Sequence, residues 1–222
     1  METVQRKQFP GWLHNWPDAD ELFCEGDVRL LHLPCVSIIG TRNISDVGRR
    51  RAAVITRFLV NSGYCVVSGL AAGVDTVAHE VALATGGKTI AVLGTPLERV
   101  YPVNNLELRR QIEREGLVIS QFPAGGPTYK SNFPKRNRLM AALAQLTVVV
   151  EASETSGTRH QVAAALSLGR SVALPISLAE SGYGWVRDAL ATGRVHVLTG
   201  LSDLSSYLVE EPRGTESHEP SA

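Results

Sequence analysis

The feature of this sequence that most constrains its fold is a regular alternation of short apolar runs with longer amphipathic segments. The apolar runs are rich in valine and isoleucine and hardly alternate with polar residues, which is typical of strands buried on both faces of a parallel sheet. They occupy residues 36–40, 64–69, 89–94, 117–122, 146–151, 171–175 and 195–198. The segments between them predict crossover helices. We therefore predict a doubly wound α/β fold with a mostly parallel sheet and helices on both faces.

Helix signals lie in the segments between the apolar runs. The segment VGRRRAAVITRFLVNSG has apolar residues near helical spacing and closes at Gly63, where a helix C-cap is expected. In the stretch SNFPKRNRLMAALAQLTVVVE, Pro134 suits the first turn of a helix. Helical spacing then places Leu139, Leu143 and Leu146 on one face, for burial against the sheet.

Length and composition indicate one domain and a local, rather than global, binding site. We expect a lead-in that caps the sheet over residues 1–35, a core over residues 36–208 and a disordered polar tail over residues 209–222. The 22 basic and 22 acidic residues give a formal net charge of zero, so any site for an anion must be local. The N-terminus lacks the apolar region of a signal peptide, and no segment approaches the roughly 20 apolar residues of a membrane span, which predicts a soluble cytoplasmic protein.

The three cysteines, Cys24, Cys35 and Cys65, lie in or beside apolar segments. They have neither the paired spacing of a zinc site nor an even number for disulfides. We expect buried, reduced thiols, and we predict neither a metal nor a cofactor.

The loop after the first predicted strand, GTRNISDVG, contains a candidate anion site. Gly40 permits a tight turn, Thr41 follows it, and the guanidinium of Arg42 offers a forked donor for phosphate. Ser45 or Asp46 can cap the next helix. The alternative for Arg42 is a solvated surface residue.

The loop after the second predicted strand, SGLAAGVD, turns at Gly69 beside Ser68 and lacks the dinucleotide-binding fingerprint. We expect Asp75 to be a helix N-cap and His79 to be a packing or surface histidine. The GGKT sequence at 86–89 is not a nucleotide-binding loop, because its lysine leads into a strand.

The most unusual loop precedes the fifth predicted strand, where Lys135, Arg136 and Arg138 cluster around Asn137 at a helix N-terminus. Cations are unfavourable at that end of a helix, by roughly 0.3 to 1 kcal/mol each at exposed sites. A bound phosphate would reverse that sign. Phe133 and also Tyr129 are interleaved with the cations, as in surfaces that bind nucleic acid. A solvated basic turn is the alternative.

The loop after the fifth predicted strand offers a second group of phosphate ligands at a helix start, Ser156, Gly157 and Thr158. Arg159 adds a cation. Glu151, at the strand end, either orients the basic cluster or has a role of its own. Ser68, His79 and Asp75 do not form a supported catalytic triad, because no nucleophile elbow surrounds the serine.

Taken together and in this order, these loops resemble the DNA-processing protein A family, also called DprA or Smf. The resemblance covers about residues 21–208. It rests on VSIIGTR, SGLAAGVD, AVLGTPLERVYPVNN, NFPKRNRLMAAL, VVVEASETSG and GRSVALP. Many members carry a helical domain before this core and a winged helix after it, for which 222 residues leave no room. Residues 158–161 depart from the family pattern.

The resemblance implies an extended Rossmann-like fold and a non-enzymatic protein that binds single-stranded DNA and loads a RecA-type recombinase. A homodimer is also expected. The implied pocket holds the phosphate backbone, and we expect it to be lined by Gly40, Thr41, Arg42, Ser68, Gly69, Phe133, Lys135, Arg136, Asn137, Arg138, Ser156 and Gly157. Phe133, alone or with Tyr129, is expected to stack on a base.

The competing interpretation is a nucleotide-handling enzyme or sensor. Phosphoribohydrolases with a Rossmann-like fold bind phosphate through a glycine-rich loop and use a nearby glutamate. Ser156–Thr158 and Glu151 are a partial likeness, although the glycine-rich run is missing. A protein that only binds partners would poorly explain the cationic cluster.

Overall fold

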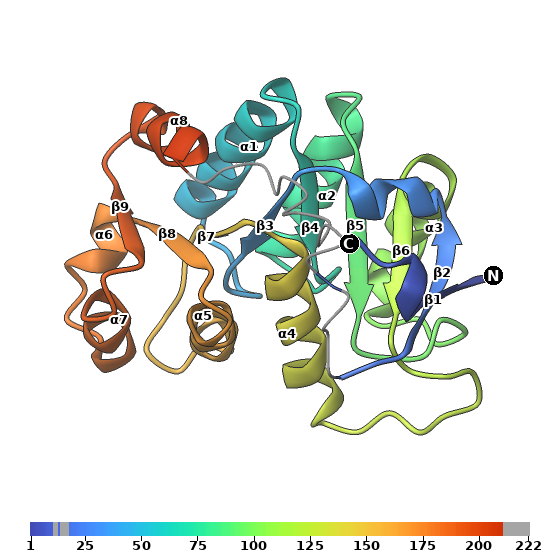
Figure 1. Cartoon of the computed structure of the whole chain (residues 1–222). Coiled ribbons are helices and arrows are strands. Elements are labelled where there is room, and N and C mark those ends of the chain that lie inside the picture. The colour runs from blue at the N-terminus through green and yellow to red at the C-terminus, as the bar shows by residue number, and fades with distance from the viewer. Residues whose placement is uncertain (11–12, 14–17, 211–222) are drawn as a thin grey trace, which may run out of the picture.

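A computed structural model describes residues 1–10, 13 and 18–210. Over these residues the chain forms one nine-stranded sheet, with strand order β1-β2-β6-β5-β4-β3-β7-β8-β9 (Figure 1). The pairings from β6 through β9 are all parallel, which confirms the predicted fold class. The seven strands predicted from the apolar runs are β3 (Cys35–Ile39), β4 (Cys65–Ser68), β5 (Thr89–Leu93), β6 (Leu117–Ser120), β7 (Leu146–Val149), β8 (Ser171–Pro175) and β9 (Val195–Leu198).

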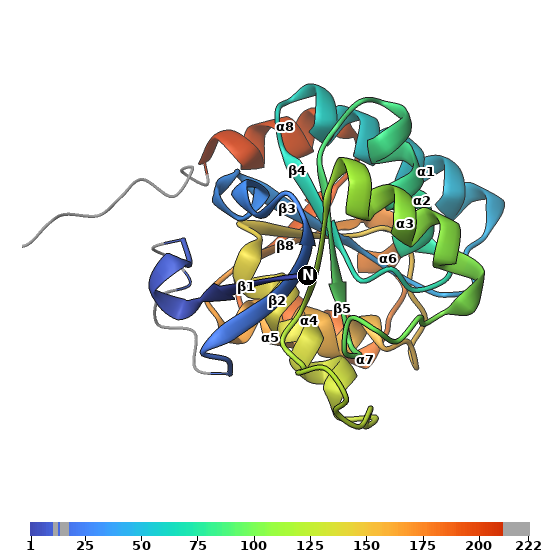
Figure 2. The ribbon, with the colours of Figure 1, turned by 90° about the vertical axis from the view of Figure 1, so that its right-hand side faces the viewer.

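Helices cover both faces of the sheet, as Figure 2 shows from the side. One face carries α1 (Asp46–Asn61), α2 (Val74–Ala84), α3 (Leu106–Glu115) and α8 (Leu201–Glu210). The other face carries α4 (Asn132–Leu143), α5 (Thr158–Ser167) and α7 (Gly184–Leu190). The short α6 (Ile176–Ala179) follows β8 directly, and 3-10 turns occupy η1 (Arg6–Gln8), η3 (Val28–His32) and η4 (Val103–Asn105).

The lead-in contributes two antiparallel strands to the edge of the sheet. β2 (Glu21–Gly26) pairs with β6, and β1 (Glu2–Gln5) pairs with β2. Leu22 and Cys24 of β2 are buried, while its intervening residues are not, so the strand has one covered and one open face. The predicted tail falls on residues 209 and 210, which end α8, and on residues 211–222, outside the described part of the chain.

Local signals account for the ends of the helices that flank the site. The Ser45 side chain accepts a hydrogen bond from the Gly48 amide, which confirms it as the α1 N-cap. Gly63 follows the end of α1 with φ of 82°, a left-handed conformation that favours glycine. Leu139 and Leu143 are buried in α4, but placing Leu146 on the same helix was wrong. The backbone becomes extended at Ala144, so Leu146 begins β7.

The sheet topology places a crevice between β3 and β7. The helix after β3 covers one face of the sheet, whereas the helix after β7 covers the other (Figure 2). The loops at their carboxyl ends therefore diverge, and such a switch point is where open α/β sheets bind ligands.

Candidate functional site

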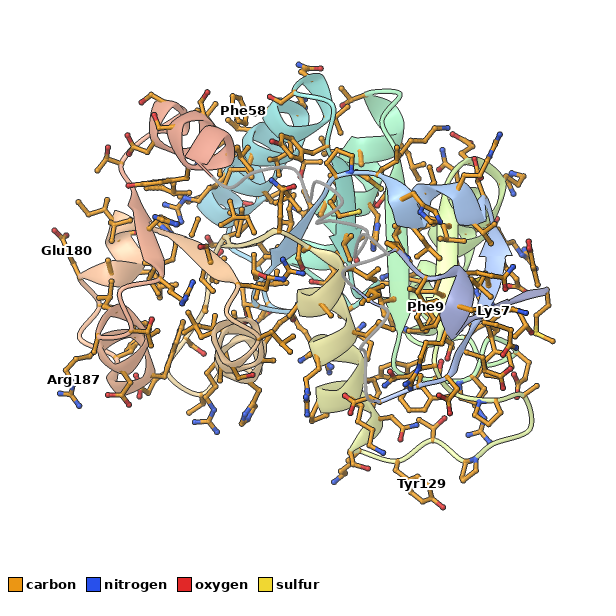
Figure 3. All side chains as sticks on the ribbon, in the orientation of Figure 1. Lys7, Phe9, Phe58, Tyr129, Glu180 and Arg187 are labelled. Atoms are coloured by element: carbon orange, nitrogen blue, oxygen red, sulfur yellow. The ribbon has the colours of Figure 1, made fainter. Side chains whose placement is uncertain are left out.

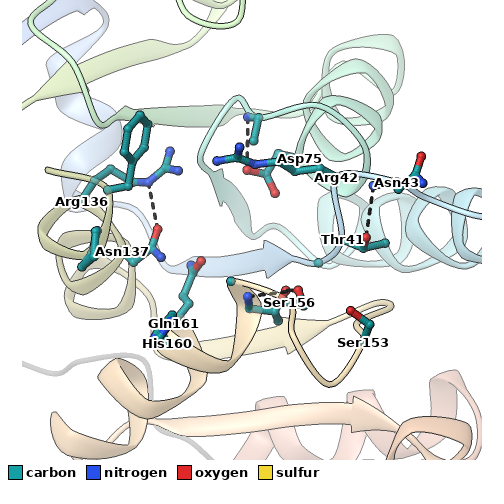
Figure 4. A pocket seen from close by; sticks show the side chains of 16 residues that line it. Thr41, Arg42, Asn43, Asp75, Arg136, Asn137, Ser153, Ser156, His160 and Gln161 are labelled. Carbon is teal, nitrogen blue, oxygen red and sulfur yellow. Dashed lines mark hydrogen bonds between the residues drawn. The ribbon is translucent and has the colours of Figure 1, made fainter. Parts of the chain in front are cut away.

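A pocket of about 470 Å³ lies at this switch point. Its volume is within the range of sites that hold small organic ligands, and larger than one phosphate requires. Figure 4 shows Arg42 and Asp75 on one side, Ser153 and Ser156 on the opposite side, and Arg136 and Asn137 at one end. The lining residues are Gly40, Thr41, Arg42, Asn43, Ala71, Asp75, Phe133, Pro134, Arg136, Asn137, Ser153, Ser156, Gly157, Thr158, His160 and Gln161.

Arg42 is the accessible cation of the pocket. Its side chain is exposed on the loop between β3 and α1, and among the described residues no carboxylate forms an ion pair with it. The preceding Thr41 orders the turn, because its hydroxyl accepts a hydrogen bond from the Asn43 amide at 3.1 Å. A free guanidinium in a polar pocket is suited to a phosphate or carboxylate ligand.

Glu151 does not pair with the basic cluster. Its Oε2 atom accepts hydrogen bonds from the amide and the hydroxyl of Ser45, at 3.1 and 3.0 Å. The carboxylate therefore lies at the N-terminus of α1, where the helix dipole favours it. It is engaged away from any ligand in the pocket.

Arg136 forms part of the pocket floor and holds three segments together. Arg136 is only 6% exposed. Its Nη1 atom donates hydrogen bonds to the carbonyls of Gly69 and Val92, the latter at 2.7 Å. Its Nε atom donates to Asn137 Oδ1 at 3.0 Å. Burial lowers the pKa of Arg136, and the nearby Asp75 carboxylate opposes that shift. Much of its donor capacity is thus directed at protein atoms rather than at a ligand.

Glycine at position 69 is required by this arrangement. A Cβ atom there would overlap the guanidinium of Arg136, whose position is fixed by the two carbonyls. The loop after β4 and the helix α4 are therefore matched to each other.

Asp75 serves the loop after β4 rather than the helix end. The N-cap of α2 is Gly73, so the N-cap prediction for Asp75 was wrong. The Asp75 Oδ2 atom instead accepts from the amides of Gly69 and Ala71, at 3.2 and 3.3 Å. Burial raises the pKa of Asp75, while Arg136 acts in the opposite direction. This carboxyl group offsets part of the positive charge of the pocket floor.

His79 is a buried packing histidine, as predicted. The Thr89 hydroxyl donates to the Val66 carbonyl at 2.8 Å, so it accepts from His79 Nδ1, which is 2.7 Å away. Burial, with a contribution from Arg136, lowers the pKa of His79 to about 3. The imidazole is therefore neutral and carries no part of the site's charge.

The side of the pocket opposite Arg42 is the N-terminus of α5. Ser156 Oγ accepts from the Thr158 amide at 3.2 Å and lies 2.7 Å from the Thr158 hydroxyl. The first turn of α5 has no acidic residue, and neither has that of α4. The positive ends of both helix dipoles therefore contribute to the pocket without a competing carboxylate in their first turns.

Of the predicted site residues, the structure brings eight together in the pocket: Gly40, Thr41, Arg42, Phe133, Arg136, Asn137, Ser156 and Gly157. Gly69 lies at an adjoining hollow, and Ser68 is buried with its hydroxyl donating to the Ile38 carbonyl at 2.7 Å. Lys135 is exposed outside the lining. Arg138 is also outside it, and its Nε lies 3.5 Å from Asp18 Oδ2. The basic cluster therefore has an acidic neighbour from the lead-in, which the local sequence around the cluster does not show.

Sequence reasoning also missed several lining residues. Asn43 follows the GTR turn directly, and Ser153 lies in the loop after β7. Both residues could have been predicted, because each lies in a loop that follows a predicted strand. His160 and Gln161 lie in the first turn of α5, on the segment noted for its departure from the family pattern.

No group of three or more histidine, cysteine, aspartate or glutamate side chains is arranged to hold a metal ion within residues 1–10, 13 and 18–210. In the same part of the chain, no helix is both long and apolar enough to cross a membrane.

The fold and the pocket define a doubly wound, Rossmann-like protein with a polar site at its switch point. Within that class, the chain belongs to the DNA recombination-mediator protein A family, whose model matches residues 1–205. The resemblance to the DprA and Smf proteins is therefore confirmed.

Curated relatives support this assignment. DNA processing protein DprA of Streptococcus pneumoniae is 38% identical over 191 residues, which are 86% of this chain and 61% of the relative. Protein Smf of a Synechocystis species is 47% identical over 125 residues, which are 56% of this chain and 31% of the relative. The chain thus spans less than two thirds of the length of these relatives.

Solved structures agree with the fold. DNA processing protein A from Streptococcus pneumoniae matches with a TM-score of 0.82 and 33% identity, covering 92% of this chain and 73% of the other. The Helicobacter pylori protein, described for its single-stranded DNA binding mode, matches with a TM-score of 0.82 and 26% identity, covering 94% and 95%. The molybdenum cofactor carrier protein of Chlamydomonas reinhardtii, at 18% identity and a TM-score of 0.57 over 80% and 97%, shares the fold alone.

Proposed function

We propose that this protein binds single-stranded DNA, with a backbone phosphate held in the pocket at the switch point. The observation that carries the proposal is the unpaired Arg42 side chain facing the α5 N-terminus across a pocket of about 470 Å³. A phosphate between them would accept charge-assisted hydrogen bonds from Arg42 on one side and lie at the positive end of the helix dipole on the other.

The lining carries a small formal excess of positive charge, which suits one backbone phosphate. Arg42 and Arg136 stand against Asp75, so the excess is one positive charge before the helix dipoles are counted. This balances the single negative charge of one phosphodiester, and the neighbouring phosphates of a strand would remain in solvent.

A second, much smaller hollow of about 10 Å³ adjoins the pocket. Arg42, Phe133 and Arg136 line both spaces, and the second is bounded further by Gly94 and Tyr101. A strand that leaves the pocket on this side would pass over the second hollow.

Arg42→Gln tests the proposal, with Arg50→Gln as the matched control. Arg50 is an exposed arginine of α1 that does not line the pocket. For a single-stranded oligonucleotide, we expect Arg42→Gln to weaken binding and to reduce the slope of log K against log salt by about 0.7, the value for one lost phosphate contact. Arg50→Gln should change the slope much less. Equal slopes for wild type and Arg42→Gln would contradict the proposal.

The same titration separates the competing function. Tight binding of a nucleoside monophosphate with release of its base would indicate a phosphoribohydrolase instead. Glu151 is bonded to Ser45 in the present arrangement, which does not favour that activity. No catalytic group is needed for strand binding, and we propose a non-enzymatic role.

We further propose that the bound strand is delivered to a RecA-type recombinase, on the basis of the family assignment, and that the working form is a homodimer. Recombinase loading would be measured as faster strand exchange on DNA coated with a single-strand-binding protein. Arg42→Gln should lose this stimulation in parallel with its loss of DNA affinity. The mass of the protein in solution would test the dimer.

A further inference from the structure

Two aromatic side chains meet at the boundary between the two hollows. The ring centroids of Tyr101 and Phe133 are 5.7 Å apart and their planes are inclined by 58°, a tilted contact of the kind that aromatic pairs favour. Phe133 comes from the first turn of α4, whereas Tyr101 comes from the loop after β5. Neighbouring rings on separate elements fix each other's orientation.

The Phe133 ring is packed closely against the residue that follows β5. A Cβ atom built at Gly94 would lie 2.6, 2.9 and 3.3 Å from Cδ1, Cε1 and Cγ of Phe133. Glycine at position 94 therefore leaves the space that the ring occupies. Phe133 is half-buried, so part of its ring is not open to a base.

Tyr101, by contrast, is 50% exposed. It lines the second hollow together with Arg42 and Arg136, and these two arginines also line the main pocket. A base that stacks on Tyr101 therefore lies beside the guanidinium proposed to hold a phosphate. Adjacent nucleotides of one strand place a base and a neighbouring phosphate in such a relation.

We infer that Tyr101 forms a base-stacking subsite for the nucleotide next to the one whose phosphate is held by Arg42. Phe133 supports the Tyr101 ring from the protein side, which reverses the expectation that Phe133 itself supplies the main stacking face. The inference rests on the proposed function, and it adds the base-contacting group that the phosphate pocket lacks. It also makes the site a binder of strands rather than of single phosphates.

Tyr129 is the natural control, because it is an even more exposed tyrosine without the same surroundings. It is 61% exposed, lies in the loop between β6 and α4, and lines neither hollow. Figure 3 shows its side chain pointing outward from that loop. Exposure alone therefore does not distinguish the two tyrosines, whereas proximity to Arg42 does.

The test compares Tyr101→Ala, Tyr101→Phe and Tyr129→Ala in binding a thymidine oligonucleotide and an oligomer of abasic deoxyribose phosphate of equal length. Stacking on one base is worth roughly 1 to 3 kcal/mol, so Tyr101→Ala should weaken thymidine oligonucleotide binding roughly 5- to 150-fold. The salt slope should stay unchanged. Tyr101→Phe keeps the ring and should remain within about twofold of wild type, and Tyr129→Ala likewise.

The abasic oligomer separates stacking from a general loss of structure. Wild type and Tyr101→Ala should bind it equally, because it offers no base to stack. If Tyr101→Ala binds the thymidine oligonucleotide as well as wild type does, or loses affinity equally for both oligomers, the subsite is overturned while strand binding through Arg42 stands. If wild type binds neither oligomer, the proposed function itself fails, and the subsite with it.

Discussion

Arg136→Ala should lower the free energy of unfolding substantially, because the arginine is a structural tie as well as a pocket residue. Its removal takes the donor from two backbone carbonyls, those of Gly69 and Val92. A buried acceptor left without a partner costs about 1 to 3 kcal/mol, so the two together cost roughly 2 to 6 kcal/mol. Water that enters from the adjoining pocket would donate hydrogen bonds to these carbonyls. We therefore expect the loss of unfolding free energy to lie in the lower half of that range, at about 2 to 4 kcal/mol.

Urea unfolding followed by far-ultraviolet circular dichroism measures this change, with the slope m checked for constancy. Lys135→Ala is the matched control, because Lys135 is the preceding cation of the same helix turn and is exposed. Its removal should change the free energy of unfolding by no more than about 0.5 kcal/mol. Stability, and not only affinity, is therefore the quantity that separates these two neighbouring cations.

One combination of results would refute the structural role of Arg136. If Arg136→Ala unfolds with wild-type stability but no longer binds an oligonucleotide, the guanidinium acts on the ligand and its two carbonyl contacts contribute nothing measurable. If the variant is destabilised, its DNA binding must be measured well below its unfolding midpoint before any affinity change is assigned to lost charge.

Three further predictions concern buried groups. Burial raises the pKa of Asp75 above its ordinary value of 3.8. The protonated carboxyl group therefore contributes its full stability below pH 3.8, and this contribution is lost as the pH rises through the pKa of Asp75 in the folded protein. The urea unfolding midpoint, measured as a function of pH, should lose this decrease in the Asp75→Asn variant. The same pH profile in wild type and variant would contradict this role of Asp75. Because the pKa of His79 is lowered to about 3, stability should fall as pH drops from 6.5 toward 3, and His79→Gln should remove this component, whereas an identical acid profile would exclude it. Cys24, Cys35 and Cys65 are buried, so a thiol reagent should react only after unfolding; rapid modification of the native protein would show that these sites open.

The parallel part of the fold was predictable from sequence because six of its seven strands, β3 to β8, are buried throughout and rich in apolar residues, while β9 is only partly buried. β2 was missed because only alternate residues, Leu22 and Cys24, are buried, and the run is short. The alternation was present in the sequence, but pairing with β6 joins segments separated by over 90 positions. Leu146 was misassigned because an apolar residue one turn after Leu143 fits a helix and a strand equally well.

The loops that build the site were also predictable, since a parallel sheet brings the carboxyl ends of its strands to one edge. The direction in which each cationic side chain points was not predictable from the sequence. Arg136 was expected to line a pocket that holds phosphate, yet much of its guanidinium is directed at the carbonyls of Gly69 and Val92. Its position also depends on the absence of a Cβ atom at Gly69. The contact of Arg138 with Asp18 joins residues far apart in the chain, which no local pattern encodes.

The switch point between β3 and β7 has a consequence for the free energy of opening the sheet. Arg42 belongs to the half of the sheet that contains β3, and the α5 N-terminus belongs to the half that begins with β7. A strand bound between them contacts both halves, so its binding free energy is lost when they separate. Bound DNA should therefore slow amide hydrogen exchange across the interior of β3 and β7, far beyond the loops that touch it.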